Sequence, residues 1–201
     1  NGRAKIICVP TTAGTGSEMS TSAVFINTET TFKYGIGGTY EFMPDIAIID
    51  PELTLELPPR ITAETGMAAL CHAEESYTNT FYNPLCSALA IEAVRLIAKS
   101  LRIAVLNGKN MEARTNMLLG STMASMAFSI KKLSDVHALS HPISAHFGTS
   151  HGLSNAVLLP IVMEYNYLAN PQAFADVALA MGVNTFGMTV NEAACASVRW
   201  V

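Results

Sequence analysis

The sequence predicts a multidomain α and β protein, in which the end of an α/β domain is followed by an all-α helical domain. Residues 5–58 are rich in β-branched residues, glycine and threonine, and they contain short apolar runs that end at turn residues. After Pro58 and Pro59, apolar residues recur at helical spacing instead. We therefore expect a first domain over 1–58 and a second, all-helical domain over 59–201.

The first part of the chain contains three candidate strands. Residues 6–9 and 46–49 are nearly continuous apolar runs, which are typical of strands buried on both faces of a sheet. Residues 24–26 form a weaker third candidate. Residues 35–38 are rich in glycine and predict a flexible loop.

Helix start and stop residues divide the second part. Thr62 is expected to cap a helix that runs to about Tyr77, and Asn83 followed by proline predicts the start of the next helix. That helix ends at Asn107, where an Asn-Gly pair follows a face of charged residues at spacings of three and four. The remaining helices are expected at 112–128, 134–146, 155–167 and 171–181.

Composition and charge exclude several classes of protein. Hydrophobic residues make up 50% of the 201 residues and charged ones only 14%, which excludes a disordered or fibrous chain. The formal net charge of −4 offers no basic stripe for nucleic acid or anionic lipid. No apolar run reaches the ~18 residues of a membrane span, and the sequence shows no charged-then-apolar stretch of the kind expected of a leader. The 4 cysteines form no CxxC pair, so we expect reduced thiols in a cytoplasmic protein.

A glycine-rich turn directly follows the first candidate strand. Residues 10–18 read PTTAGTGSE, and glycine N–H groups with threonine hydroxyls could hold a phosphate or a ribose. Met19 stands where a dinucleotide fingerprint has its third glycine, and no Gly-Lys-Ser/Thr follows as in a Walker loop. A tight polar turn without a ligand is the open alternative.

The histidines are unevenly distributed along the chain. Four of the 5 lie between His137 and His151, and His137 and His141 are four residues apart, which places them on one face of a helix. A helical histidine and a loop histidine such as His151 can converge, together with His72, on a metal ion. Each histidine alone could instead be an ordinary hydrogen-bonded residue. Several imidazoles in an apolar domain cost stability unless something pairs with them, which favours a shared site.

Five segments form a recognisable pattern when taken in order. They are PTTAGTGSE (10–18), DPELT (50–54), TAETGM (62–67), VHALSHP (136–142) and SHGLSNAVLLP (150–160). Through them the chain resembles the iron-containing (group III, metal-dependent) alcohol dehydrogenase family, from Val9 to about Tyr167. The resemblance implies a dehydroquinate synthase-like fold, with an α/β nucleotide-binding domain, a helical metal-binding domain and an active site in the cleft between them. The family's pyrophosphate loop would precede Asn1 and its last helices would follow Val201, so we interpret the chain as a fragment truncated at its C-terminus.

The resemblance also implies site residues, position by position. The residues that match cofactor contacts are Thr11, Thr12, Thr15, Ser20, Lys33 and Leu53. Those that match metal ligands are His72, His137 and His151, while His141 matches the catalytic histidine beside the nicotinamide and the substrate.

One position departs from the family pattern. The family motif Gly-Met-Asp-Ala-Leu carries the fourth metal ligand, but residues 66–70 here read Gly-Met-Ala-Ala-Leu, so Ala68 cannot ligate. Losing the anionic ligand should weaken Fe²⁺ binding most, whereas Zn²⁺ tolerates three histidines and water. Glu75 or Asp135 could replace the carboxylate only if the backbone shifted.

The function implied by the resemblance is a metal-dependent oxidoreductase. It would transfer a hydride between a primary alcohol or aldehyde, or a related hydroxy compound, and NAD or NADP, with Fe²⁺ as the expected metal and Zn²⁺ as the alternative. The implied partners are a small alcohol or aldehyde and further copies of the chain, in a dimer or larger homo-oligomer. Two alternatives stay open because of Ala68: a catalytically silent homologue, or a metal-independent carbonyl reductase of the maleylacetate reductase type.

Overall fold

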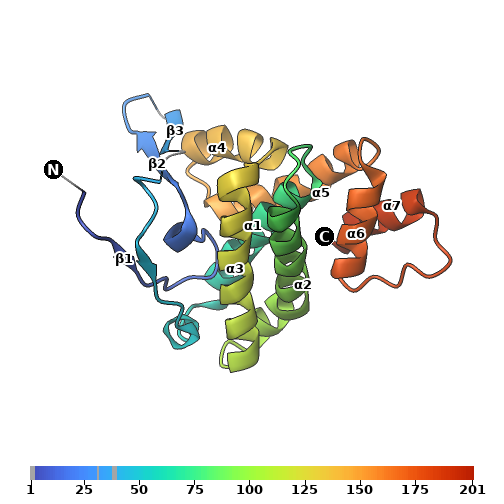
Figure 1. The fold of residues 1–201 in the computed structure, drawn as a ribbon, viewed down its shortest axis with the longest axis horizontal. Coiled ribbons are helices and arrows are strands. Elements are labelled where there is room, and N and C mark those ends of the chain that lie inside the picture. The colour runs from blue at the N-terminus through green and yellow to red at the C-terminus, as the bar shows by residue number, and fades with distance from the viewer. Residues whose placement is uncertain (1–2, 31, 38–39) are drawn as a thin grey trace.

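The computed structural model describes residues 3–30, 32–37 and 40–201, and it places a strand-bearing segment beside a bundle of helices (Figure 1). The strands are β1 (Ile7–Cys8), β2 (Ser22–Asn27), β3 (Phe32–Gly37) and β4 (Ile46–Ala47). The α-helices are α1 (Pro59–Thr78), α2 (Pro84–Leu106), α3 (Met111–Lys131), α4 (Asp135–Phe147), α5 (His151–Asn166), α6 (Pro171–Ala180) and α7 (Val190–Trp200). Two short 3₁₀ helices, Ser17–Met19 and Pro51–Thr54, lie in the first segment.

The strands form two separate pairs. β1 pairs with β4 in parallel, with Ile7 opposite Ile46, and β2 and β3 form an antiparallel hairpin. The prediction that both apolar runs are buried on both faces was wrong for this chain, because Ile7 is 58% and Ile46 52% exposed. Each pair consists of only two strands, so no sheet encloses these side chains.

The glycine-rich stretch after residue 34 is not a flexible loop as far as the structure describes it. Gly35 and Gly37 belong to β3 and pair with Val24 and Ser22 across the hairpin. Backbone pairing with β2 therefore outweighs the low strand propensity of glycine. Residue 38, the last of the predicted loop, lies outside the described residues.

The helices were predicted better than the strands, although α1 and α5 begin a few residues earlier than predicted. Asn83 caps α2 as predicted, since its side chain accepts a hydrogen bond from the Cys86 N–H at 3.1 Å. Thr62 is not the cap of α1, which already begins at Pro59. Instead, Thr62 is buried in the first turn, where its hydroxyl accepts a hydrogen bond from Arg114 at 2.8 Å.

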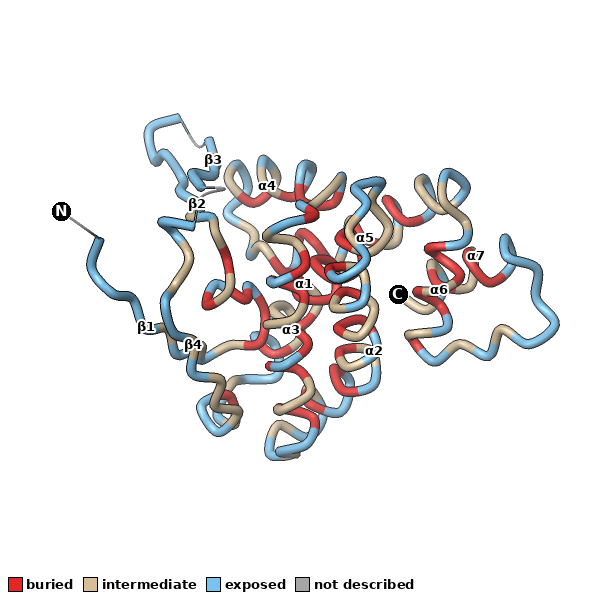
Figure 2. The backbone as a smooth tube through the Cα atoms, in the orientation of Figure 1, coloured by how far each residue is buried: buried red, intermediate tan, exposed pale blue. Residues whose placement is uncertain are grey.

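The core lies where α1 packs against α2, α3 and α5, and buried backbone is concentrated there (Figure 2). Leu70 of α1, Ile97 of α2 and Leu159 of α5 are completely buried. Burying a side chain of this size contributes roughly 1.5–3 kcal/mol each. The core therefore fixes the spacing between α1 and α5, two of the helices that carry histidines.

Two further expectations concern thiols and membranes. All 4 cysteines are free, with Cys71 and Cys86 buried and Cys8 and Cys195 half-buried. Within the described ranges, no helix combines the length and the apolar character that crossing a bilayer requires.

Candidate metal centre

Three imidazoles from three different helices meet at one point. His72 of α1, His137 of α4 and His151 of α5 each offer a ligand atom, and these atoms lie within 4.8 Å of one another. The ring centroids of His72 and His137 are 4.7 Å apart, and those of His137 and His151 are 5.1 Å apart. Three ligand atoms this close together could hold one metal ion.

The third imidazole is positioned by the start of a helix and not, as the sequence suggested, by a loop. His151 is the first residue of α5, whose start is capped by the Ser150 hydroxyl accepting from the Leu153 N–H at 3.2 Å. Gly152 lets this end of α5 approach α1, because a Cβ there would lie 2.0 Å from the Glu64 carbonyl oxygen. A larger residue at 152 would push His151 away from His72.

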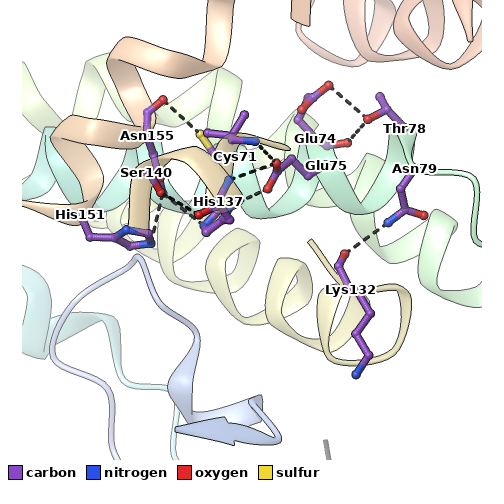
Figure 3. A network of polar contacts seen from close by, with 11 residues as sticks. Cys71, Glu74, Glu75, Thr78, Asn79, Lys132, His137, Ser140, His151 and Asn155 are labelled. Carbon is purple, nitrogen blue, oxygen red and sulfur yellow. Dashed lines mark hydrogen bonds and ion pairs between the residues drawn. The ribbon is translucent and has the colours of Figure 1, made fainter. Parts of the chain in front are cut away.

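Glu75 orients His137 and is not a substitute ligand. Its Oε1 accepts the Val136 N–H at 2.7 Å, and its Oε2 is 2.5 Å from Nδ1 of His137 (Figure 3). With Nδ1 held by the carboxylate, Nε2 of His137 is the nitrogen that faces the other imidazoles. A carboxylate on the far nitrogen fixes the tautomer and the ring orientation of a ligating histidine.

Burial keeps the three imidazoles neutral. It lowers the pKa of His137 to about 3 and that of His72 well below the usual value. Burial, aided by the charge of Lys33, lowers the pKa of His151 to about 2. Neutral imidazoles have the free lone pair that a metal ligand needs, so the site is ready to bind at neutral pH.

The site also contains polar atoms that lack a partner. Nδ1 of His72 and Nδ1 of His151 are buried and make no hydrogen bond within the described part of the chain. Buried polar groups are nearly always satisfied in folded proteins. An unpaired imidazole nitrogen on His72, beside the Nε2 atoms of His137 and His151, fits a divalent cation as the missing partner.

The fourth ligand position has no carboxylate. Ala68 is buried one turn before His72, and among the described residues no aspartate or glutamate joins the three imidazoles as a further ligand. Asp135 is exposed and accepts a hydrogen bond from Asn166 at 2.9 Å. Neither Asp135 nor Glu75 therefore replaces the missing carboxylate.

His141 and Lys33 lie next to the three imidazoles. The half-buried ring of His141 is 5.3 Å from that of His151, and Lys33 is half-buried on β3, which contacts α4. Burial, followed by the charge of Lys33, lowers the pKa of His141. His146 lies in the last turn of α4, is exposed and does not belong to this group.

The glycine-rich turn is wedged between two helices. A Cβ on Gly14 would lie 2.7 Å from Cβ of Thr65 in α1, and one on Gly16 would lie 2.3 Å from Cβ of Ser125 in α3. The buried Glu18 accepts a hydrogen bond from the Thr122 hydroxyl at 2.7 Å. These glycines thus allow the turn to pack closely against α1 and α3.

The other candidate cofactor contacts are spread over the first segment. Thr11 and Thr15 are exposed on the turn, Thr12 is half-buried, and the Thr15 hydroxyl accepts the Ser17 N–H at 3.2 Å. The hydroxyl of Ser20 bonds to the backbone of Ser22 and so helps to start β2. Leu53 is exposed on a separate 3₁₀ helix, Pro51–Thr54. The structure does not gather all of them around the histidines, although Lys33 lies close to them.

One residue of the site was missed in the sequence. Asn155 follows His151 by four residues on α5, is completely buried, and its Nδ2 donates to Nε2 of His137 at 3.2 Å and to Nε2 of His151 at 3.3 Å. The spacing of four in a helix is the signal that could have found it. Its connection to His137, however, depends on how α4 packs against α5.

Comparison with known proteins gives a consistent family. Residues 62–201 match the model of the Fe-containing alcohol dehydrogenase family, C-terminal, and residues 1–51 match the model of iron-containing alcohol dehydrogenase. The chain is 47% identical over 189 residues to 1,3-propanediol dehydrogenase of Citrobacter freundii, covering 94% of this chain and 49% of that protein. It is 44% identical over 187 residues to long-chain-alcohol dehydrogenase 1 of Geobacillus thermodenitrificans, covering 93% of this chain and 47% of that protein.

A solved structure gives the same likeness in three dimensions. The crystal structure of a 1,3-propanediol oxidoreductase superimposes with a TM-score of 0.95 at 43% identity, covering 100% of this chain and 52% of that one. The chain spans about half the length of the curated relatives that it matches.

Proposed function

Because the chain belongs to the iron-containing alcohol dehydrogenase family, we propose that it forms part of an oxidoreductase that transfers a hydride between a small alcohol or aldehyde and NAD or NADP. Residues 1–58 would supply the end of the NAD(P)-binding domain, and residues 59–201 the helical domain that holds the metal. The observation that carries the proposal is the convergence of three neutral imidazoles from α1, α4 and α5. The 1,3-propanediol dehydrogenases among the relatives support a small alcohol as substrate.

The metal would be held by His72, His137 and His151. A divalent cation bound there supplies Lewis-acid polarisation of the substrate oxygen. Glu75 keeps Nε2 of His137 directed at the centre, and burial excludes the protons that would compete for the imidazole nitrogens. Because Ala68 provides no carboxylate, the donor set is neutral and suits Zn²⁺ better than Fe²⁺.

His141 would accept the hydroxyl proton of the alcohol. Its lowered pKa keeps the imidazole neutral at pH 7, so it can take up a proton as the hydride leaves for the nicotinamide. Because the ring is only half-buried, the proton can pass on to water. Lys33 would hold the cofactor beside this histidine, with Thr11, Thr12 and Thr15 as further contacts on the turn and Ser20 and Leu53 farther along the segment.

Ala68 supports a second candidate, a reductase that acts without metal. Three neutral imidazoles bind a dication less tightly than the same set with a carboxylate, so a carbonyl reduction assisted only by His141 and Lys33 would suit a site of this composition. A catalytically silent homologue is the third case to be separated.

Metal analysis combined with cofactor oxidation distinguishes these cases. The purified protein is assayed for bound metal and for NADH or NADPH oxidation with a panel of short aldehydes, before and after chelation. We expect bound metal, and turnover that chelation abolishes and Zn²⁺ or Fe²⁺ restores. Turnover that survives complete metal removal would favour the metal-independent reductase, and the absence of both metal and turnover would favour the silent homologue.

A further inference from the structure

Asn155 lies between the imidazoles without a role in the proposed chemistry. Figure 3 shows its side chain directed at the rings of His137 and His151, to which Nδ2 donates at 3.2 and 3.3 Å. Its Oδ1 is buried and has no hydrogen-bond partner among the described residues. A completely buried amide with one end unsatisfied calls for a further partner.

The distances place the end of this amide where a metal ligand would lie. Two donors bound to one Zn²⁺ at about 2.1 Å, at the angles of tetrahedral or octahedral geometry, are about 3.0–3.4 Å apart. The Nδ2 atom of Asn155 is 3.2 Å from Nε2 of His137 and 3.3 Å from Nε2 of His151. The end of the amide thus already lies as far from two of the three imidazoles as one metal ligand lies from the next.

Metal binding reverses which end of the amide is favoured there. In the structure, Nδ2 of Asn155 donates to the imidazole lone pairs that a cation would take over. Once those lone pairs are occupied, the same N–H groups would point at a positive ion. A half-turn about the Cβ–Cγ bond exchanges Nδ2 for Oδ1 in nearly the same place. Oδ1 gives up no hydrogen bond when it moves, and Nδ2 takes the buried position in which Oδ1 has no partner among the described residues.

The surroundings leave this position open to Asn155. The nearby Glu75 is engaged by His137 and the start of α4, and Ala68 has no donor atom. The backbone of Asn155 is fixed, because its carbonyl oxygen accepts a contact from the Cys71 thiol at 3.8 Å and Gly152 seats α5 against α1.

We propose that Asn155 is the fourth protein ligand of the metal centre: its amide turns so that Oδ1 supplies the oxygen donor that position 68 lacks. The proposal rests on the metal centre of the proposed function and adds a ligand to it. The resulting donor set, three imidazoles and one neutral amide oxygen, keeps the full positive charge of the dication in the site.

Metal titrations of the purified protein test this assignment without any catalytic assay. Zn²⁺ affinity is measured by competition with a chromophoric chelator, and Co²⁺ is used as a probe because its visible absorption reports ligand number. Asn155→Ala should weaken Zn²⁺ binding at least tenfold and alter the Co²⁺ spectrum, whereas Asn155→Asp should tighten it at least tenfold. The matched control is Asn166→Ala on the same helix, which should leave the affinity within twofold.

A second background separates ligation from a structural role. With Ala68→Asp present, a carboxylate supplies the oxygen, so Asn155→Ala should then change the affinity less than threefold. If Asn155→Ala has the same effect in both backgrounds, or leaves the Co²⁺ spectrum unchanged, Asn155 only supports the fold and the proposal is wrong. If Asn155→Ala fails to fold, the nearly isosteric Asn155→Asp provides the test instead. Weaker Zn²⁺ binding in Asn155→Asp than in the wild type would equally overturn the proposal. A wild-type protein that binds neither metal would refute the metal centre itself, which is a different failure.

Discussion

The helical segment and the strand-bearing segment hold their candidate residues in opposite ways. The imidazoles of His72 and His137 are buried on long helices that pack around a common core. Thr11, Thr15 and Leu53 lie exposed on a segment that is attached to α1 and α3 by a glycine-rich turn. The proposed metal centre is therefore preorganised by the fold of the chain itself, whereas the proposed cofactor contacts depend on how the first segment packs against α1 and α3.

The largest effect is expected from removing an imidazole. His137→Ala takes away one of the three proposed imidazole ligands and leaves Oε2 of Glu75 without its partner, so Zn²⁺ affinity should fall at least 100-fold in a chelator-competition titration. The control is His146→Ala on the same helix, whose Zn²⁺ affinity should stay within twofold of the wild-type value. Equal affinities for the two variants would show that the helical segment does not carry the site.

A carboxylate in the empty ligand position should act in the opposite direction. Ala68→Asp adds an anionic donor one turn before His72, and we expect Zn²⁺ and Fe²⁺ binding to tighten about 10–100-fold, with Fe²⁺ gaining more. The metal-free variant should unfold at a lower temperature than wild type, because a charge is buried without a partner. Unchanged affinity by calorimetry would mean that position 68 does not face the metal.

The turn offers a test of the strand-bearing segment alone. Gly16 has φ of 60° and a Cβ there would meet Ser125, whereas Gly148 has φ of 65° and nothing within 4 Å in the described part of the chain. Gly148→Ala should lower the free energy of unfolding by about 1 kcal/mol, through backbone strain alone. Gly16→Ala should lower it by about 2–3 kcal/mol, because the added Cβ also pushes the turn away from α3. Denaturant unfolding measures both.

These variants should also separate the two kinds of site. We expect Gly16→Ala to weaken NAD(H) binding while Zn²⁺ affinity stays within twofold. If both glycine variants lose the same free energy of unfolding, the turn does not pack closely against α3 as the structure shows.

The smallest expected effect is a local loss of stability around Asp45 at low pH. Asp45 accepts hydrogen bonds from the Ile6 N–H at 3.0 Å and from Arg3 at 2.6 Å, and these contacts lower its pKa to about 2. A carboxyl whose pKa is lower in the folded than in the unfolded state stabilises the folded state at any pH above its unfolded pKa. For Asp45 this contribution is lost as the pH falls through about 2. The Ile6 amide should therefore become less protected from hydrogen exchange below pH 4, before the helices change. Asp45→Asn should abolish that pH dependence, and a persistent dependence would assign it to another group.

Helices could be predicted from the sequence because their signals are local. The Asn83 cap and the Asn107 stop lie beside the residues they affect, and the first core helix was placed to within a few residues. The exposure of Ile7 and Ile46 could not be predicted in this way, because the cover of a strand is set by elements far along the chain.

The site shows the same division. His72, His137 and His151 were found through their motifs, but no spacing along the chain gives their common centre, which arises where three helices meet. Glu75 was considered only as a ligand, although its contact with His137 comes from the packing of α4 on α1. Asn155 was overlooked because its spacing of four from His151 indicates only a shared helix face, whereas its contact with His137 comes from the packing of α4 on α5.

Anomalous diffraction from crystals grown with Zn²⁺ tests the central claim most directly. The account predicts one strong metal peak per chain, about 2.0–2.1 Å from a ring nitrogen of each of His72, His137 and His151. A well-ordered structure without density between these rings, or with the metal bound elsewhere, would contradict it.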